Sequence, residues 1–164
     1  MLILYQLMNM KNSLLILSVL SVLFLNSGCL KDNSCNARSV DSEKGEIISY
    51  AIANGIVATE HSSGLYYEVI SAGTGPAPTL SSTVSVRYTG KLLNGTVFDS
   101  QTGTPVTFPL GQVIPGWQLG LPLVQEGGII KLIIPSALAY GCTGVGTIPG
   151  NSILFFEIQL VDVQ

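Results

Sequence analysis

Few residues of this sequence have the types and spacing that nucleophilic or metal-dependent chemistry requires. The only histidine, His61, lies in a polar stretch before Ser62-Ser63-Gly64, and no G-x-S-x-G motif occurs, so a hydrolase triad would have no base. No phosphate-binding P-loop and no dinucleotide-binding fingerprint occurs either. The histidine and the cysteines also lack the close spacing of zinc ligands. We therefore expect neither a metal nor a cofactor.

The remaining candidate residues lie in five short segments of the C-terminal part of the chain. They are VRYTG at 86–90, GTVFDS at 95–100, FPLGQVIPGWQLGL at 108–121, LAYG at 138–141 and IPGNSILFFEIQL at 148–160. In this order and at these separations, the segments resemble the FKBP family of peptidyl-prolyl cis-trans isomerases over roughly residues 64–164. The resemblance implies an enzyme that accelerates rotation about X-Pro peptide bonds and assists the folding of exported proteins. It also implies proline-containing polypeptides as clients and a macrolide as a further ligand.

The resemblance also implies which residues form the site. Asp99 would face the substrate amide, Tyr140 would donate a hydrogen bond to a substrate carbonyl, and Phe98 would be the third catalytic residue. Trp117 would form the floor of a substrate-binding pocket whose members are Tyr88, Phe108, Val113, Ile114, Trp117, Ile148 and Phe156. By residue type alone, each aromatic side chain could instead be ordinary core packing, and Asp99 could merely cap a turn.

Two departures from the family pattern concern the shape of this pocket. A second wall aromatic of many family members corresponds to Val106 here, and the loop after Tyr140 is one residue shorter. An alternative function is therefore a non-catalytic chaperone or assembly module that binds peptides in the same groove. Binding to nucleic acid is not expected, because the formal net charge of −3 would repel phosphate backbones.

The elements that would carry these residues follow from hydrophobic periodicity. From residue 65 onward apolar and polar residues alternate, as in half-buried strands, and the clearest apolar face is Leu154, Phe156, Ile158 and Leu160. Asn94-Gly95 predicts a two-residue hairpin turn. Only one short helix fits, at about residues 117–124, so the pattern predicts an α+β fold. The resemblance implies a twisted antiparallel sheet of five or six strands wrapped around that short helix.

A further helix is expected ahead of this domain. Asp41 or Ser42 can cap it, it ends at Asn54-Gly55, and its apolar stripe consists of Ile47, Ile48, Ala51 and Ile52. Because such a stripe must be covered, the helix either docks on the domain or mediates dimerisation, and we favour docking. We interpret residues 42–63 as an N-terminal helix with a linker, and residues 64–164 as the isomerase domain.

The N-terminal residues have the pattern of a targeting signal. Lys11 precedes an uncharged apolar run at 14–25, which is shorter than the about 20 residues of a membrane span. Asn26-Ser27-Gly28-Cys29 then resembles a bacterial lipobox, in which Cys29 is acylated. We expect a lipoprotein signal peptide at 1–28, a tether at 29–41, and a protein exported and lipid-anchored to a bacterial membrane on its periplasmic or cell-surface side. An ordinary secretory signal is the alternative.

Two further cysteines remain in the exported chain. Because export leads to an oxidising compartment, Cys35 and Cys142 could form a disulfide between the tether and the domain. They could also be two free thiols.

Overall fold

The computed structural model describes residues 35–164. The expected signal peptide at 1–28, the lipidation site Cys29 and the first part of the tether lie outside the described residues. Within residues 35–164, no helix is long and apolar enough to cross a membrane.

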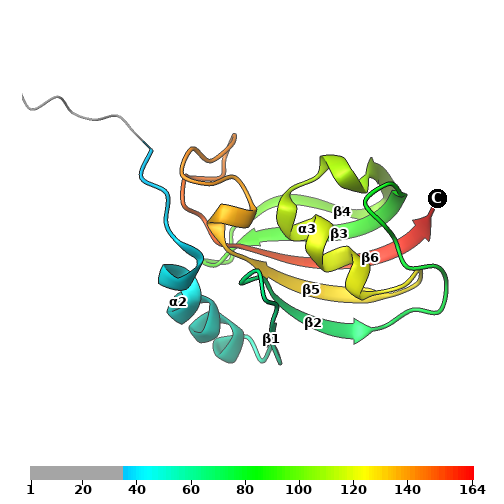
Figure 1. Cartoon of the computed structure of the whole chain (residues 1–164), viewed down its shortest axis with the longest axis horizontal. Helices are drawn as coiled ribbons and strands as arrows, with labels where there is room; N and C mark the ends of the chain where they lie inside the picture. The colour runs from blue at the N-terminus through cyan, green and yellow to red at the C-terminus, as the bar shows by residue number, and fades with distance from the viewer. Residues whose placement is uncertain (1–34) are drawn as a thin grey trace, which may run out of the picture. The chain divides into compact units, whose positions relative to one another are not determined.

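One six-stranded sheet forms the centre of the fold (Figure 1). Its strand order is β1-β2-β5-β6-β3-β4, and every neighbouring pair is antiparallel. The strands are β1 (Thr59–Glu60), β2 (Tyr66–Ser71), β3 (Thr83–Leu92), β4 (Val97–Pro109), β5 (Ile129–Ile134) and β6 (Leu154–Val163). The predicted α+β fold, an antiparallel sheet of five or six strands with one short helix, is confirmed. The first strand, β1, lies in the stretch that we interpreted as a linker.

The main core lies between one face of the sheet and the short helix α3 (Pro115–Gly120). The predicted apolar face of the last strand is confirmed, because every second residue of β6 from Leu154 to Leu160 is buried. Strand β3 shows the same alternation, with Val84 and Val86 fully buried. The period-two pattern therefore identified the core-facing side of β3 and of β6.

Helix α3 is short and lies very close to the sheet. Pro115 starts it, and the chain continues as a 3-10 turn at Leu121–Leu123, so the predicted helix at 117–124 begins two residues earlier and its second half is not α-helical. Gly120 faces β5, where a Cβ atom would lie 2.6 Å from Cδ2 of Leu132. The missing side chain lets the helix backbone approach the strand and brings Trp117 down onto the sheet.

The hairpin between β3 and β4 forms at the predicted place but with a longer turn. Leu92 N–H donates to the Thr96 carbonyl (2.9 Å) and Gly95 N–H donates to the Leu92 carbonyl (2.9 Å), which leaves three residues in the loop. The two-residue prediction was wrong, because that turn needs positive φ at both Asn94 and Gly95. Only Gly95, at φ 89°, adopts it.

Helix α2 (Val40–Ala53) differs from its prediction in cap and in buried face. Its N-cap is Ser39, whose side chain accepts a hydrogen bond from the Ser42 N–H at 3.3 Å, so neither predicted cap is used. The buried row is Glu43, Ile47 and Ala51, whereas Ile48 is 40% and Ile52 76% exposed. The prediction counted only apolar residues as buried and therefore missed Glu43. The predicted apolar face was consequently turned around the helix axis, toward Ile48 and Ile52.

The expectation that α2 docks on the domain agrees with the packing. The helix covers part of the sheet face opposite α3, and a second apolar cluster forms there from Ile47, Ala51, Ile56, Tyr66, Ile133, Ile153 and Phe155. The rings of Tyr50 and Phe155 lie 5.7 Å apart within this contact. The sheet is therefore covered on both faces at its β2–β5 side.

The start of the described chain is linked to the loop that follows β5. Cys35 and Cys142 form a disulfide, with their Cα atoms 5.4 Å apart. Figure 1 shows the start of the described chain, in blue, beside this loop, in orange. A covalent bond across 107 positions of sequence restricts the unfolded chain strongly.

Replacing Ile47 by alanine should lower the free energy of unfolding by about 2–5 kcal/mol, because it removes buried methyl groups and leaves a cavity under α2. The same change at Ile52, which is 76% exposed, should alter that free energy by no more than about 0.5 kcal/mol. Denaturant titration of both variants measures the difference. Equal losses in the two variants would contradict the docking of α2.

Candidate active site

A hollow of about 340 Å³ opens beside α3 on the core side of the sheet. Its lining consists of Tyr88, Phe98, Asp99, Phe108, Gln112, Val113, Ile114, Trp117, Tyr140 and Phe156. All but one of the site residues that the resemblance implies therefore surround one cavity. The exception, Ile148, is buried in the main core and does not line the hollow.

Neighbouring strands bring the aromatic side chains together. Tyr88 comes from β3, which lies between β4 with Phe98 and Phe108 and β6 with Phe156. Trp117 reaches the same place from α3, and its side chain is only 4% exposed. Strand β4 follows β3 directly through a hairpin, whereas β6 is remote in the sequence and pairs with β3 only in the folded sheet, so the hollow depends on the strand order.

Trp117 forms the floor and contacts three other rings. Its ring centroid lies 5.1 Å from that of Tyr88, 5.3 Å from that of Phe156 and 6.1 Å from that of Phe108, each in an edge-on arrangement. Edge-on aromatic pairs contribute about 0.5–1.5 kcal/mol each beyond the apolar area that they bury. The floor of the hollow is therefore also a rigid part of the core.

Gly90 of β3 makes room for one wall. Phe98 and Phe156 meet edge-on with their centroids 5.5 Å apart, directly beside this glycine. A Cβ atom on Gly90 would lie 2.7 Å from atoms of both rings. The glycine of the VRYTG segment thus has a packing reason that sequence analysis did not identify.

Asp99 and Tyr88 form the main polar contact of the hollow. The Tyr88 hydroxyl donates a hydrogen bond of 2.5 Å to Oδ2 of Asp99. Burial raises the pKa of the Tyr88 phenol above its ordinary value, and the hydrogen bond and the charge of Asp99 raise it further. Asp99 lies within β4 and does not cap a turn, so its carboxylate is held in the hollow by a protonated neighbour.

Tyr140 reaches the hollow from the loop after β5. The residue is 36% exposed, and its pKa is raised first by burial and then by the negative charge of Asp99. The Tyr140 backbone carbonyl accepts hydrogen bonds from the Gly144 N–H (3.3 Å) and the Thr143 hydroxyl (3.2 Å). Tyr140 therefore adds a hydroxyl that stays protonated to the lining of the hollow.

Comparison with known proteins agrees with this geometry. The family model described as FKBP-type peptidyl-prolyl cis-trans isomerase matches residues 75–161. The chain belongs to this family. The match covers every residue that lines the hollow, and it leaves out β1, β2 and the last residues of β6.

Relatives and solved structures of the FKBP-type family give the same result. FkpA of Aeromonas hydrophila is 45% identical over 130 residues, which cover 76% of this chain and 47% of that protein. The crystal structure of FkpA from Escherichia coli has a TM-score of 0.69 at 38% identity and covers 94% of this chain and 71% of that one. A crystal structure of a peptidyl-prolyl cis-trans isomerase from Pseudomonas syringae has a TM-score of 0.65 at 32% identity, covering 79% of this chain and 98% of that one. The chain spans less than half the length of several curated relatives that it matches.

The structure adds one residue to the lining of the hollow and places Val106 outside it. Gln112 lines the hollow and was not predicted; the only signal was its place directly before Val113 and Ile114. Val106, which the resemblance placed where many family members have a second wall aromatic, pairs with Val86 and packs on the main core without lining the hollow. The wall on that side is therefore formed without a large side chain at position 106.

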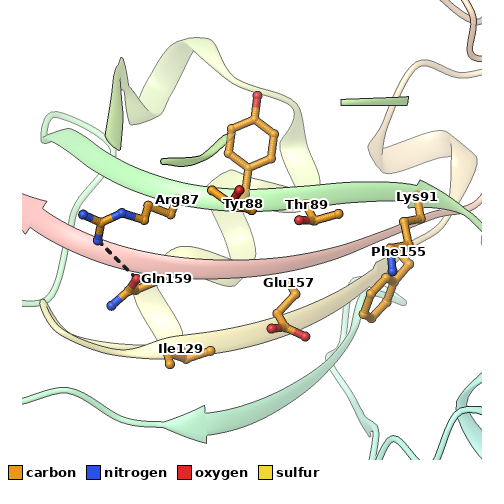
Figure 2. A pocket seen from close by; sticks show the side chains of 9 residues that line it. Arg87, Tyr88, Thr89, Lys91, Ile129, Phe155, Glu157 and Gln159 are labelled. Atoms are coloured by element: carbon orange, nitrogen blue, oxygen red, sulfur yellow. Dashed lines mark hydrogen bonds between the residues drawn. The ribbon is translucent and has the colours of Figure 1, made fainter. Parts of the chain in front are cut away.

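A second hollow, of about 320 Å³, lies on the opposite face of the sheet (Figure 2). Figure 2 shows Tyr88 pointing away from the neighbouring side chains, as the alternation along β3 requires. The Arg87 guanidinium donates hydrogen bonds to the Gly103 carbonyl (2.7 Å) and to Oε1 of Gln159 (3.3 Å). The one aromatic ring that faces this hollow, Phe155, is packed against α2. This surface is lined mostly by polar and charged side chains and has no aromatic floor, so the hollow over Trp117 is the better candidate site.

Replacing Asp99 by asparagine should lower the pKa of Tyr88, because the negative charge and the hydrogen bond of Asp99 both favour the protonated phenol. Tyr88 should still titrate above about pH 10, the ordinary value, since burial is the larger cause. The pKa of Tyr140 should fall as well. NMR titration of labelled tyrosine rings measures both changes, and an unchanged Tyr88 pKa would contradict the contact.

The direction of the linked stability change follows from the raised pKa of Tyr88. Above about pH 10 the unfolded chain loses the phenol proton that the folded chain retains. The raised pKa therefore contributes fully to the free energy of unfolding below about pH 10, and this contribution is lost as the pH rises further. Asp99→Asn should make the loss smaller.

Proposed function

We propose that this chain accelerates cis-trans isomerisation of X-Pro peptide bonds in polypeptide clients. The observation that carries the proposal is the aromatic hollow over Trp117, with Asp99 and Tyr140 beside it. Membership of the FKBP-type family supports it.

The chemistry requires neither a nucleophile nor a metal. Resonance gives the amide C–N bond a rotation barrier of about 18–20 kcal/mol, and X-Pro bonds isomerise unaided in tens to hundreds of seconds. In the twisted transition state the resonance is lost and charge separation across the amide falls. A catalyst therefore has to bind the twisted amide more tightly than the planar one.

The apolar walls favour the twisted amide in two ways. They replace water, which stabilises the more polar planar amide. They also anchor the proline ring, which would pack on Trp117 and gain on the order of 1.5–3 kcal/mol, as for a buried side chain of medium size. Phe98 and Phe156 would flank that ring from the sheet side. With the ring fixed, the residue before proline is the part that rotates.

The polar groups would hold the peptide while it rotates. The hydroxyl of Tyr140 would donate a hydrogen bond to a substrate carbonyl, and Asp99 would face the amide that twists. We propose an electrostatic or orienting role for Asp99, since isomerisation transfers no proton in its rate-limiting step. The hydrogen bond from Tyr88 would fix the direction of the Asp99 carboxylate.

A second candidate is a peptide-binding chaperone or assembly module that uses the same hollow without useful turnover. The position of Val106 outside the lining favours it, because a hollow without an aromatic ring from that position would hold a proline ring by fewer contacts. In either case the clients are proline-containing polypeptides, and a macrolide could occupy the same apolar hollow. Binding and catalysis are separated by the first experiment below.

Export and membrane anchoring belong to the same proposal. The disulfide between Cys35 and Cys142 supports an oxidising compartment, where such bonds persist. The signal-like segment at 1–28 and the lipobox-like Cys29 support a lipid anchor on the periplasmic or cell-surface side of a bacterial membrane. The clients would then be other exported proteins.

The purified chain should accelerate isomerisation of a short X-Pro peptide in NMR exchange measurements. Replacing Asp99 by alanine should lower kcat/KM by roughly tenfold or more, the effect of losing one charged interaction, while the protein stays folded. Asp162→Ala, a change of the same type on β6 outside the hollow, should leave kcat/KM unchanged. Peptide binding without any acceleration by the folded chain would favour the chaperone.

The intact mass of the full chain extracted from membranes should correspond to a protein that begins at Cys29 and carries lipid chains. Cys29→Ser should abolish both this processing and membrane retention, because no thiol remains to be acylated. Mass spectrometry measures both forms. An unmodified Cys29, or cleavage at another position, would instead indicate an ordinary secretory signal.

A further inference from the structure

The chain ahead of the sheet contacts the loop that carries Tyr140 at both ends. This loop runs from residue 136 to residue 151, and the contacting segment is 35–43. Neither the hollow nor the proposed chemistry accounts for these contacts, because no residue of 35–43 lines the hollow. Their position suggests that the segment acts on the site through the loop.

Glu43 makes the contact at the start of the loop and is fully buried, with 0% exposure. One carboxylate oxygen accepts a hydrogen bond from the Ser136 backbone N–H (2.8 Å), and the other accepts from the Ser136 hydroxyl (2.6 Å). The Arg38 Nε lies 3.5 Å from Oε1 of Glu43, the oxygen that also accepts from the Ser136 hydroxyl. Burying a carboxyl group is costly unless it is paired, so this cluster fixes Ser136 firmly relative to α2.

Ser136 connects this carboxylate to Tyr140 within a few residues. The Ser136 carbonyl accepts hydrogen bonds from the N–H groups of Ala139 (3.1 Å) and Gly141 (2.9 Å). Tyr140 lies between those two donors in the chain. A shift of Ser136 would therefore move the backbone on both sides of the Tyr140 ring.

The far part of the loop is held by the same segment. The disulfide joins Cys35 to Cys142, two positions after Tyr140. The Asn151 side chain accepts from the Arg38 N–H (3.2 Å) and donates to the Asn36 carbonyl (2.9 Å). The Asn151 N–H in turn donates to the Gly141 carbonyl (2.8 Å). The loop thus has fixed points on either side of Tyr140.

We propose that Glu43 is a positioning residue for prolyl isomerisation, acting through Ser136 on the loop that presents the Tyr140 hydroxyl to the substrate. The inference rests on the proposed function and extends it to a helix outside the sheet. Without the carboxylate, the loop loses its anchor at Ser136 while the disulfide still restrains Cys142. The Tyr140 hydroxyl then spends less time where it can donate a hydrogen bond to the substrate carbonyl, so the substrate is bound less tightly.

The central experiment compares Glu43→Leu with Glu46→Leu in steady-state isomerisation of a short X-Pro peptide. Glu43→Leu removes both acceptors of Ser136 and should raise KM by roughly three- to tenfold, the effect of one weakened hydrogen bond, with kcat little changed. Glu46 is on the same helix and also pairs with Arg38, but its side chain is 52% exposed and makes no bond to the loop. Glu46→Leu should leave KM unchanged.

A conservative variant tests the hydrogen bonds themselves. Glu43→Gln keeps a carbonyl oxygen for the Ser136 N–H and an amide that can donate to the Ser136 hydroxyl, so it should restore KM to near the wild-type value. If the KM of Glu43→Gln is as high as that of Glu43→Leu, the hydrogen bonds between Glu43 and Ser136 do not position the loop, and the proposal is overturned. If Glu43→Leu does not fold, Ser136→Ala decides: it removes one of the two bonds and should raise KM, and an unchanged KM overturns the proposal.

Thermal unfolding and amide exchange separate positioning from mere stability and from failure of the proposed function. A folded Glu43→Leu variant that is less stable but has the wild-type KM would refute the positioning role. Should the wild-type chain show no isomerase activity, the proposed function fails, and amide exchange at Gly141 still tests the anchor. Exchange there should be severalfold faster in Glu43→Leu than in Glu46→Leu, and equal rates would refute the anchor.

Discussion

The apolar face of the sheet is larger than the one helix that covers it, and the site depends on this mismatch. Six residues of α-helix span about 9 Å, whereas a ten-residue strand such as β6 spans about 33 Å. Gly116 and Gly120 let α3 lie directly on β5, so the helix covers that strand closely and leaves the β3–β4 side of the sheet open. Aromatic side chains are long enough to cover the remainder, and they do so around a hollow. The cavity is thus a consequence of how the core is closed.

Because the hollow forms where the core is closed, Trp117 is both a core residue and the surface on which a ligand would pack. Its edges and faces contact Tyr88, Phe108 and Phe156, so the floor of the hollow has little freedom to move. The carboxylate of Asp99 lies beside this apolar surface and is satisfied by the Tyr88 hydroxyl. A fixed charge next to a rigid apolar floor is the combination that the proposed twisting of a prolyl amide requires, because neither group has to rearrange during the rotation.

The opposite face of the sheet connects the N-terminal helix to the same site. Helix α2 covers Tyr66, Ile133 and Phe155, and its buried row ends at Glu43 beside the loop that carries Tyr140. The disulfide to Cys142 adds a covalent link in the same region. The loop is consequently held from outside the sheet as well as from β5, which is the physical basis for assigning the N-terminal helix a part in the site.

The local sequence was enough to identify the strands, the short helix and the family. Only the tertiary structure showed which contacts support the site from outside. The alternation in β3 and β6 and the segments around Tyr88, Asp99 and Trp117 depend on spacing within a few residues, which a sequence displays directly. The rotated face of α2, the three-residue turn at Gly95 and the lining role of Gln112 depend on contacts with distant parts of the chain. Glu43 is the clearest case: a buried acidic residue breaks the apolar pattern, and its partner Ser136 lies 93 positions away. Periodicity reports which residues avoid water, but it cannot report a polar group that leaves water because a remote partner satisfies it.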